Sequence, residues 1–409
     1  MTHRVLMLGL PAFGHVIPSL ATAAELVRRG SEVTFVTVDA HAERARRMGA
    51  TVVTYPSLDP VARLQTAGPV QSVMLLLEEN ALILRAVEAH LAGSGPRPDL
   101  VAYDSQAFQA GRVLAARWGL PAVQLEPVFA SNEHYSFMRE MTEATAAAGP
   151  VPTPDELAAY GKRNAELLAE HGVTMPVMEL LTKVEDFHVV FVPRAFQPRG
   201  ETFDERFAFV GPCAPPGGDA TAGAGADSPP PWRPPAGDRP VALISLGTTY
   251  NNDAGFFRTA LRAFEGLGHH LVLALGHGLD PAALGPLPPH AEAHAWITYR
   301  DVLRYASVFV TQGGMGSLTE AMHEGCPTVV VPGSASYLPG CRRAAELGLG
   351  EVLRPEELNA ERLRAAVLRL AGDAELGERL ADMRRSTREA GGAMRAAEEI
   401  TAYLERTTR

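Results

Sequence analysis

The sequence predicts an α/β fold of two doubly wound, Rossmann-like domains that face each other across a cleft. Three observations support this prediction. The chain has 409 residues, which is too long for one ordinary hydrophobic core and long enough for two. In both halves, short β-rich segments alternate with amphipathic helical segments, as in βαβ units with a parallel sheet. A segment dense in Gly, Pro and Ala separates the halves and indicates a linker.

Residues 1–212 are expected to form the first domain. They open with a strand-like segment, and we expect the helix that follows it to begin at Pro18. Residues 131–182 are mostly helical, and we interpret them as an insertion that covers a pocket. The strand-like segments of this half are, in order, RVLMLGL, EVTFVTV, TVVTY, PDLVAYD, PAVQLEP, FHVVFVP and RFAFVG.

Residues 213–240 form the expected linker, and the strand and helix alternation restarts in residues 241–390, the expected second domain. Its strand-like segments include VALISLG, HHLVLALG, VFVTQGG and PTVVVPG. We expect residues 391–409 to form a C-terminal helix that packs back on the first domain.

The composition narrows the class of ligand. A formal net charge of -10 argues against a nucleic-acid-binding surface, which needs Lys and Arg to neutralise phosphates. The three cysteines lie far apart and show no metal-ligand spacing. No apolar segment has the length of a signal sequence core or a membrane span. We therefore expect a cytoplasmic protein that acts on small molecules, with no nucleic-acid or membrane partner; a homodimer is left open.

Polar residues follow two strands of the first half. His15 comes after the first strand, and Asp104 ends the strand PDLVAYD. Because the carboxyl ends of parallel strands meet at one edge of a sheet, the carboxylate is able to orient the imidazole and leave Nε2 as a general base. The competing interpretations are a loop histidine bonded to nearby backbone and an aspartate that only caps the next helix.

Glycine turns follow two strands of the second half. Gly247 and Thr248 lie in one of them. In the other, QGGMGSLTE, the glycines permit close backbone approach and Ser317 lies near a helix N-terminus, where the helix dipole favours a phosphate. Glu320, one turn further, is placed to accept hydrogen bonds from a diol. The alternative is an ordinary strand-to-helix turn with a solvated glutamate.

These motifs resemble the GT-B-fold glycosyltransferases that act on macrolides and other aglycones in natural-product pathways. The resemblance covers nearly the whole chain and rests on PAFGHVIPSL, PDLVAYD, the linker, WITYRDVL, VFVTQGGMGS and VVVPG. It implies that His15 is the base and Asp104 its orienting carboxylate. It also implies that Trp296 stacks on the nucleotide base, Glu320 binds ribose and Ser317 binds phosphate.

The chain departs from the family pattern at the donor diphosphate and sugar. Gln312 stands where the family has histidine, and Thr298-Tyr299 stands in place of Pro-Gln. Ser336-Tyr337 replaces an acidic sugar-binding residue and its neighbour, and Gly340 replaces an asparagine. The full expected donor site comprises Gly247, Thr248, Trp296, Gln312, Gly314, Met315, Gly316, Ser317, Glu320, Ser336 and Tyr337.

The resemblance implies an inverting, metal-independent glycosyltransferase. It would move a sugar, such as a deoxysugar, from a UDP or dTDP donor to a hydroxyl of a polyketide-like or other hydrophobic acceptor, with no cofactor. The expected acceptor-binding residues are Phe13, Phe129, His134, Tyr135 and Phe137. Two alternatives remain open. One is a related enzyme that has lost sugar transfer and uses His15 and Asp104 for elimination, cyclisation or rearrangement. The other is a non-catalytic partner of a true transferase.

Overall fold

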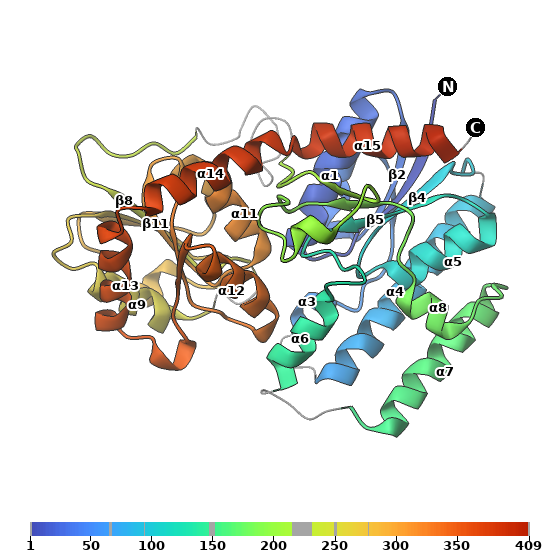
Figure 1. Ribbon diagram of the computed structural model, residues 1–409, viewed down its shortest axis with the longest axis horizontal. Coiled ribbons are helices and arrows are strands. Elements are labelled where there is room, and N and C mark those ends of the chain that lie inside the picture. The colour runs from blue at the N-terminus through green and yellow to red at the C-terminus, as the bar shows by residue number, and fades with distance from the viewer. Residues whose placement is uncertain are drawn as a thin grey trace.

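The structure, a computed structural model, describes residues 2–64, 68–93, 95–146, 152–214, 231–248, 252–276 and 278–407. These residues form two α/β domains, each built on one parallel sheet (Figure 1). The predicted fold class is therefore confirmed. Most of the expected linker, residues 215–230, lies outside the described residues.

The N-terminal sheet has the strand order β3-β2-β1-β4-β5-β6-β7, and every neighbouring pair is parallel. Helices α1 and α15 pack on one face of this sheet, and α4 and α5 pack on the other. The strands are β1 (Arg4–Leu8), β2 (Glu32–Thr37), β3 (Thr51–Thr54), β4 (Leu100–Asp104), β5 (Ala122–Glu126), β6 (His188–Val190) and β7 (Phe207–Phe209). The helices are α1 (Phe13–Arg28), α2 (Asp39–Arg47), α3 (Pro60–Arg63), α4 (Pro69–Ala92), α5 (Phe108–Trp118), α6 (Phe137–Ala146), α7 (Pro154–Glu170) and α8 (Val177–Thr182).

The C-terminal sheet has the order β10-β9-β8-β11-β12-β13, again parallel throughout. Its strands are β8 (Val241–Ser245), β9 (His270–Ala274), β10 (Ala291–His294), β11 (Ala306–Thr311), β12 (Thr328–Val330) and β13 (Gly350–Val352). The helices are α9 (Ala254–Ala263), α10 (Tyr299–Leu303), α11 (Met315–Glu324), α12 (Leu338–Glu346), α13 (Ala360–Gly372), α14 (Leu376–Glu389) and α15 (Gly392–Thr407).

The strand order reverses at one place in each sheet. In the first sheet the chain builds β1, β2 and β3 outward and then returns to place β4 on the other side of β1. In the second sheet β11 returns beside β8 in the same way. Ligands of open α/β sheets bind at the carboxyl ends of strands at such switch points. His15 follows β1 and Asp104 ends β4 in the first sheet, and Gly247 and Gln312 follow β8 and β11 in the second.

Helix α15 crosses from the second domain to the first and lies along α1 (Figure 1). The ring of Tyr403 stacks on Phe187 with centroids 4.9 Å apart. Arg29 at the end of α1 joins Glu398 of α15 at 2.8 Å and also bonds Glu25. The chain therefore ends on the domain in which it began.

Candidate active site

His15 and Asp104 are in direct contact at the carboxyl ends of β1 and β4. His15 Nδ1 lies 2.9 Å from Oδ2 and 3.1 Å from Oδ1 of Asp104. The aspartate is fully buried, whereas the imidazole keeps 16% of its side-chain surface exposed. With Nδ1 donating to the carboxylate, Nε2 is left as the proton acceptor.

The helix that carries His15 begins earlier than expected. Helix α1 starts at Phe13, so Pro18 lies inside it rather than at its start. Proline cannot donate an intrahelical bond, and here the backbone bonds of His15 and Val16 to the Ala12 carbonyl have already established the first turn. His15 is therefore held in the first turn of a helix and not in a loop.

Asp104 does not cap the following helix. Helix α5 begins at Phe108, and its N-cap is Ala107. Asp104 Oδ1 instead accepts from the backbone N–H of Gln106 at 2.9 Å. This bond fixes the carboxylate in the turn after β4, so the buried charge is oriented toward His15 by the backbone itself.

The surroundings of His15 act on its pKa in opposite directions. Burial lowers the pKa, but the charge of Asp104 and its hydrogen bond raise it, and the charge of Glu126 adds to them. The net effect raises the pKa of His15 above its usual value. A base with a raised pKa accepts a proton more readily, and it must be deprotonated before it can act.

The two domains meet beside this histidine. Phe13, the first residue of α1, makes an edge contact with Trp296 of the second domain, with ring centroids 5.3 Å apart. The guanidinium of Arg44 lies 5.8 Å from the centre of the same phenylalanine ring. Trp296 lies in the turn between β10 and α10. It contacts Phe13, which precedes His15 by two residues on α1.

The glycine turn after β11 has the shape needed to receive an anion. Gly313 has φ +83, and a Cβ there would lie 2.3 Å from Cys341 Sγ, so only glycine fits. Gly314 is the N-cap of α11, and Met315, Gly316 and Ser317 form its first turn. Gly316 is exposed, and a Cβ on it would meet no atom within 4 Å. The open N-terminus of α11 is therefore accessible at Gly316 and Ser317.

Gln312 lies at the mouth of this turn and is clamped between two glycines. Its side chain is 3% exposed. A Cβ on Gly247 would lie 2.7 Å from its Nε2, and a Cβ on Gly333 would lie 2.6 Å from its Oε1. Within the described part of the chain, that buried Oε1 has no hydrogen-bond partner. The glutamine amide therefore has little freedom to turn.

Glu320 lies one turn into α11. Burial raises the pKa of its carboxyl to about 7, although the positive charge of Arg300 opposes the shift. A buried carboxylate is stabilised when hydroxyl groups donate to it. The site is thus matched to a ligand that brings hydroxyl donors.

The two residues expected at the sugar differ in what they offer. The Ser336 hydroxyl is engaged with Ser334 Oγ at 3.0 Å. The ring of Tyr337 approaches the turn, with Cζ 4.0 Å from the position of a Cβ on Gly314. Both lie in a short 3-10 helix, Ala335–Tyr337. Thr248, after β8, is exposed, and Met315 is half-buried.

The expected acceptor residues separate into two groups. Phe129 is 1% exposed and packs against Tyr135, Phe137 and Phe196 in the core that continues into the second domain. The Tyr135 side chain is also buried, and its hydroxyl donates to Glu140 at 2.5 Å. Phe129 therefore lies in the core, whereas Tyr135, although largely buried, also lines a cavity between the domains. Phe13 and Phe137 are half-buried and His134 is exposed.

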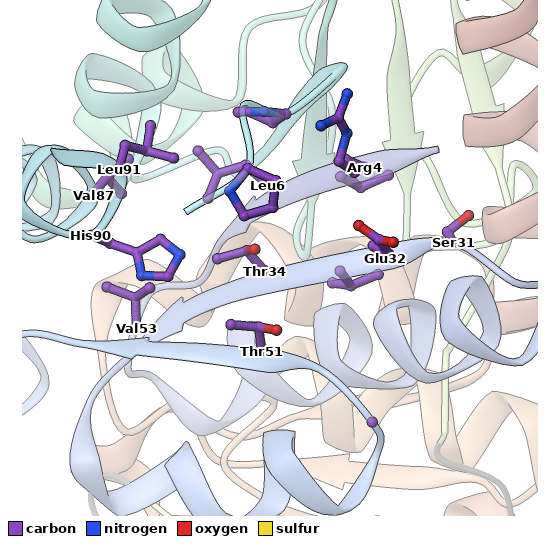
Figure 2. A pocket seen from close by; sticks show the side chains of 15 residues that line it. Arg4, Leu6, Ser31, Glu32, Thr34, Thr51, Val53, Val87, His90 and Leu91 are labelled. Atoms are coloured by element: carbon purple, nitrogen blue, oxygen red, sulfur yellow. The ribbon is translucent and has the colours of Figure 1, made fainter. Parts of the chain in front are cut away.

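Two cavities lie apart from the catalytic pair and the glycine turn. A cavity of about 240 Å³ lies at the amino ends of β1, β2 and β3, the edge opposite His15, and is lined by Arg4, Thr34 and His90 among others (Figure 2). A second, of about 550 Å³, lies between the domains and is lined by Tyr135, one of the expected acceptor residues, together with residues of α6 and α12 and the 198–201 loop. Neither is lined by His15, Asp104 or the glycine turn.

Sequence reasoning missed two residues of the donor side. Ser245 ends β8, and its hydroxyl contacts that of Tyr299. Gly333 makes room for Gln312. In the sequence, Tyr299 stands out only as a departure from the family pattern. Ser245 could have been found from its position at the end of a strand beside the switch point.

Two features of the described residues bear on the expected partners and metal. No helix in the described ranges combines the length and apolar character required to cross a bilayer. In the same ranges no three His, Cys, Asp or Glu side chains gather as a metal site would require. The metal-independent mechanism stays a prediction.

Comparison with known proteins places these features in context. Residues 258–399 match the model of the erythromycin biosynthesis protein CIII-like C-terminal domain. The chain is 36% identical to the demethyllactenocin mycarosyltransferase of Streptomyces fradiae, over 97% of this chain and 85% of that protein. It is 33% identical to the oleandomycin glycosyltransferase of Streptomyces antibioticus, over 98% and 91% of the two chains.

The fold is also shared with a solved structure. The crystal structure of CalG4, the calicheamicin glycosyltransferase, superimposes with a TM-score of 0.85 at 41% identity and covers 100% of both chains. The likeness therefore extends over both domains.

Proposed function

The chain belongs to the GT-B-fold glycosyltransferases of natural-product pathways, and from that premise we propose how its residues divide the work. It transfers a sugar from a nucleoside diphosphate sugar to a natural-product acceptor. The N-terminal domain supplies the base that activates the acceptor, and the C-terminal domain holds the donor. The observation that carries this assignment is the 2.9 Å contact between His15 and the buried Asp104 at the switch point of the first sheet.

On the acceptor side, His15 Nε2 takes the proton of the acceptor hydroxyl as the oxygen attacks the anomeric carbon. The bond from that carbon to the diphosphate oxygen breaks, and the nucleoside diphosphate leaves with the bonding electrons. Attack from the face opposite the leaving group inverts the anomeric centre. Asp104 stabilises the imidazolium that forms, because its buried carboxylate keeps a charge-assisted hydrogen bond to Nδ1.

On the donor side, Trp296 stacks on the base and Glu320 accepts hydrogen bonds from ribose hydroxyls. The diphosphate lies at the turn after β11, where backbone N–H groups of residues 314–317 and the N-terminus of α11 face it. Such donors stabilise the negative charge that grows on the leaving diphosphate. We propose that these groups act without a metal ion and that the nucleotide is UDP or dTDP.

The sugar is proposed to carry few hydroxyls. Ser336 already hydrogen-bonds Ser334, and Tyr337 presents an aromatic ring toward the turn. Neither residue offers the carboxylate that would accept two sugar hydroxyls, so a deoxysugar leaves fewer buried polar groups unpaired. The relatives are transferases, and the two alternatives, an enzyme that has lost transfer and a silent partner, are not favoured.

Thermal unfolding in the presence of UDP, dTDP, uridine and thymidine tests the donor assignment. A ligand at one hundred times its dissociation constant stabilises the folded state by about 2.7 kcal/mol. We expect one diphosphate to raise the melting temperature more than its nucleoside does at equal concentration. The absence of a shift with either diphosphate would remove the donor site from the proposal.

We further propose that the enzyme works in the cytoplasm on small molecules, alone or as a homodimer. Cys213, Cys326 and Cys341 are free and buried, which suits a reducing compartment.

A further inference from the structure

Tyr299, the first residue of α10, connects three segments of the donor domain. Its hydroxyl contacts the hydroxyl of Ser245, the last residue of β8. Its ring makes an edge contact with Phe309 of β11, with centroids 5.3 Å apart. Burial raises the pKa of Tyr299 to about 12, so the phenol stays protonated and able to donate.

The hydrogen bonds of Ser245 determine the direction of this contact. Its Oγ donates to the Ala274 carbonyl at 2.9 Å, which uses the one proton of the hydroxyl. The backbone N–H of Gly247 donates to the same oxygen at 3.1 Å. The remaining acceptor position is filled by Tyr299, so the serine is saturated and the turn after β8 is held at Gly247.

The turn at Gly247 determines where the Gln312 amide lies. Gly247 has φ +71, and its missing side chain leaves the space occupied by Gln312 Nε2, 2.7 Å from the Cβ position. Ser245 pairs with Thr311 across β8 and β11, so the ends of the two strands are side by side. A shift of Gly247 would therefore move the amide that lies at the mouth of the glycine turn.

We propose that Tyr299 is a positioning residue for the donor diphosphate: through Ser245 it holds the Gly247 turn and the Gln312 amide in the arrangement that receives the phosphate oxygens. The inference rests on the proposed function, because it assumes a nucleoside diphosphate at the turn after β11. The Gln312 amide is a neutral donor, whereas the Gly247 N–H is already used by Ser245 Oγ. Neutral donors bind phosphate less strongly than charged ones, so their geometry has to be maintained by the protein.

The substitution Tyr299→Phe removes only the hydroxyl and keeps the ring on Phe309. We expect the Kd of the bound diphosphate, UDP or dTDP, to rise about two- to tenfold, which corresponds to one neutral hydrogen bond. The Kd of the matching nucleoside should stay unchanged, and the KM for the donor sugar should rise with little change in kcat. Tyr305→Phe is the matched control, because Tyr305 is 39% exposed and lies outside this network.

Ser245→Ala provides a second route to the same prediction. It removes the oxygen that links Tyr299 to Gly247, so it should weaken diphosphate binding at least as much. Because the Tyr299 hydroxyl also contacts the Gly247 backbone N–H directly, the loss in the double variant should exceed that of Ser245→Ala but fall short of the sum of the two single losses. If Tyr299→Phe unfolds at the assay temperature, the serine variant is measured in its place.

The outcomes are distinct. An equal loss of affinity for nucleoside and diphosphate would mean that Tyr299 supports the domain in general, and unchanged diphosphate affinity in both variants would also overturn the proposal. If the unmodified protein binds neither UDP nor dTDP, the proposed function itself fails. A loss confined to the diphosphate supports the positioning role.

Discussion

Replacing Asp104 by asparagine isolates the contribution of the buried carboxylate to catalysis. The substitution keeps the shape of the side chain and removes a charge that is fully buried and lies 2.9 and 3.1 Å from His15 Nδ1. A hydrogen bond to a charged group contributes about 1.5–3 kcal/mol. At about 1.4 kcal/mol per tenfold, this loss alone lowers the rate by about 10- to 150-fold.

A second effect adds to the first. The asparagine amide can donate to Nδ1, which would move the imidazole proton to Nε2 and remove the base. The corresponding change in Ser-His-Asp triads lowers kcat by about 10⁴. We therefore expect kcat/KM of Asp104→Asn to fall by about 10² to 10⁴, measured as initial rates of transfer with saturating donor sugar.

The dependence of kcat/KM on pH should also change in a definite direction. A base must be deprotonated, so kcat/KM falls as the pH drops through the pKa of His15, which Asp104 helps to raise in the native protein. Without the carboxylate, burial still lowers that pKa, so the acid limb should move to lower pH. The rate at the optimum falls while the acid limb moves away from neutrality.

The control is a histidine and carboxylate pair away from the cleft. His171 Nδ1 lies 2.7 Å from Glu88, which is on α4. Glu88→Gln should leave kcat/KM within about twofold, as surface substitutions away from a site usually do. An Asp104→Asn protein that is folded, transfers sugar within threefold of the native rate and keeps its acid limb in place would refute the assignment of His15 as base.

Three further predictions follow from single features of the structure. Burial raises the pKa of Glu320 to about 7. If ribose binding needs the carboxylate, the affinity for the diphosphate should weaken as the pH falls below about 7, by up to tenfold per pH unit. Calorimetry should show a flatter dependence of affinity on pH for Glu320→Gln. A Cβ on Gly316 meets no atom within 4 Å, so Gly316→Ala should keep the melting temperature while it reduces the affinity for the diphosphate. In Gly313→Ala the added Cβ is forced against Cys341, and this variant should be destabilised by several kcal/mol, of order 3. Hydrogen bonds from Arg28, joined by Arg29, lower the pKa of Glu25 to about 2. The stability that Glu25 contributes is therefore present above its usual pKa and is lost as the pH falls toward 2. In acid unfolding, the difference in stability between the native protein and Glu25→Gln should shrink over this range, and a constant difference would contradict the prediction.

The sequence was sufficient for the class of fold and for the neighbourhood of the site. Alternation of β-rich and amphipathic segments is a local property, and parallel strands place their carboxyl ends together whatever the details of packing. This is why the sequence alone predicts His15 and Asp104, and the turns at Gly247 and Gln312, as candidate site residues.

Side-chain packing was not readable in the same way. Phe129 resembled an acceptor contact because its apolar surroundings are the same for a pocket wall and for a core, and only the close packing with Phe196 separates the two. The start of α1 at Phe13 was missed because proline often begins helices, whereas here the turn before it was already formed.

The sequence alone determined that this protein would present polar residues at the ends of two parallel sheets, because side-chain periodicity and strand direction are properties of short segments. Only the tertiary structure decided that Asp104 reaches an imidazole 89 residues away in the chain, that burial brings the pKa of Glu320 to about 7, and that the hydroxyls of Tyr299 and Ser245 meet. Each of these depends on desolvation and on distances between segments that are far apart in sequence, and such quantities exist only once both domains have packed.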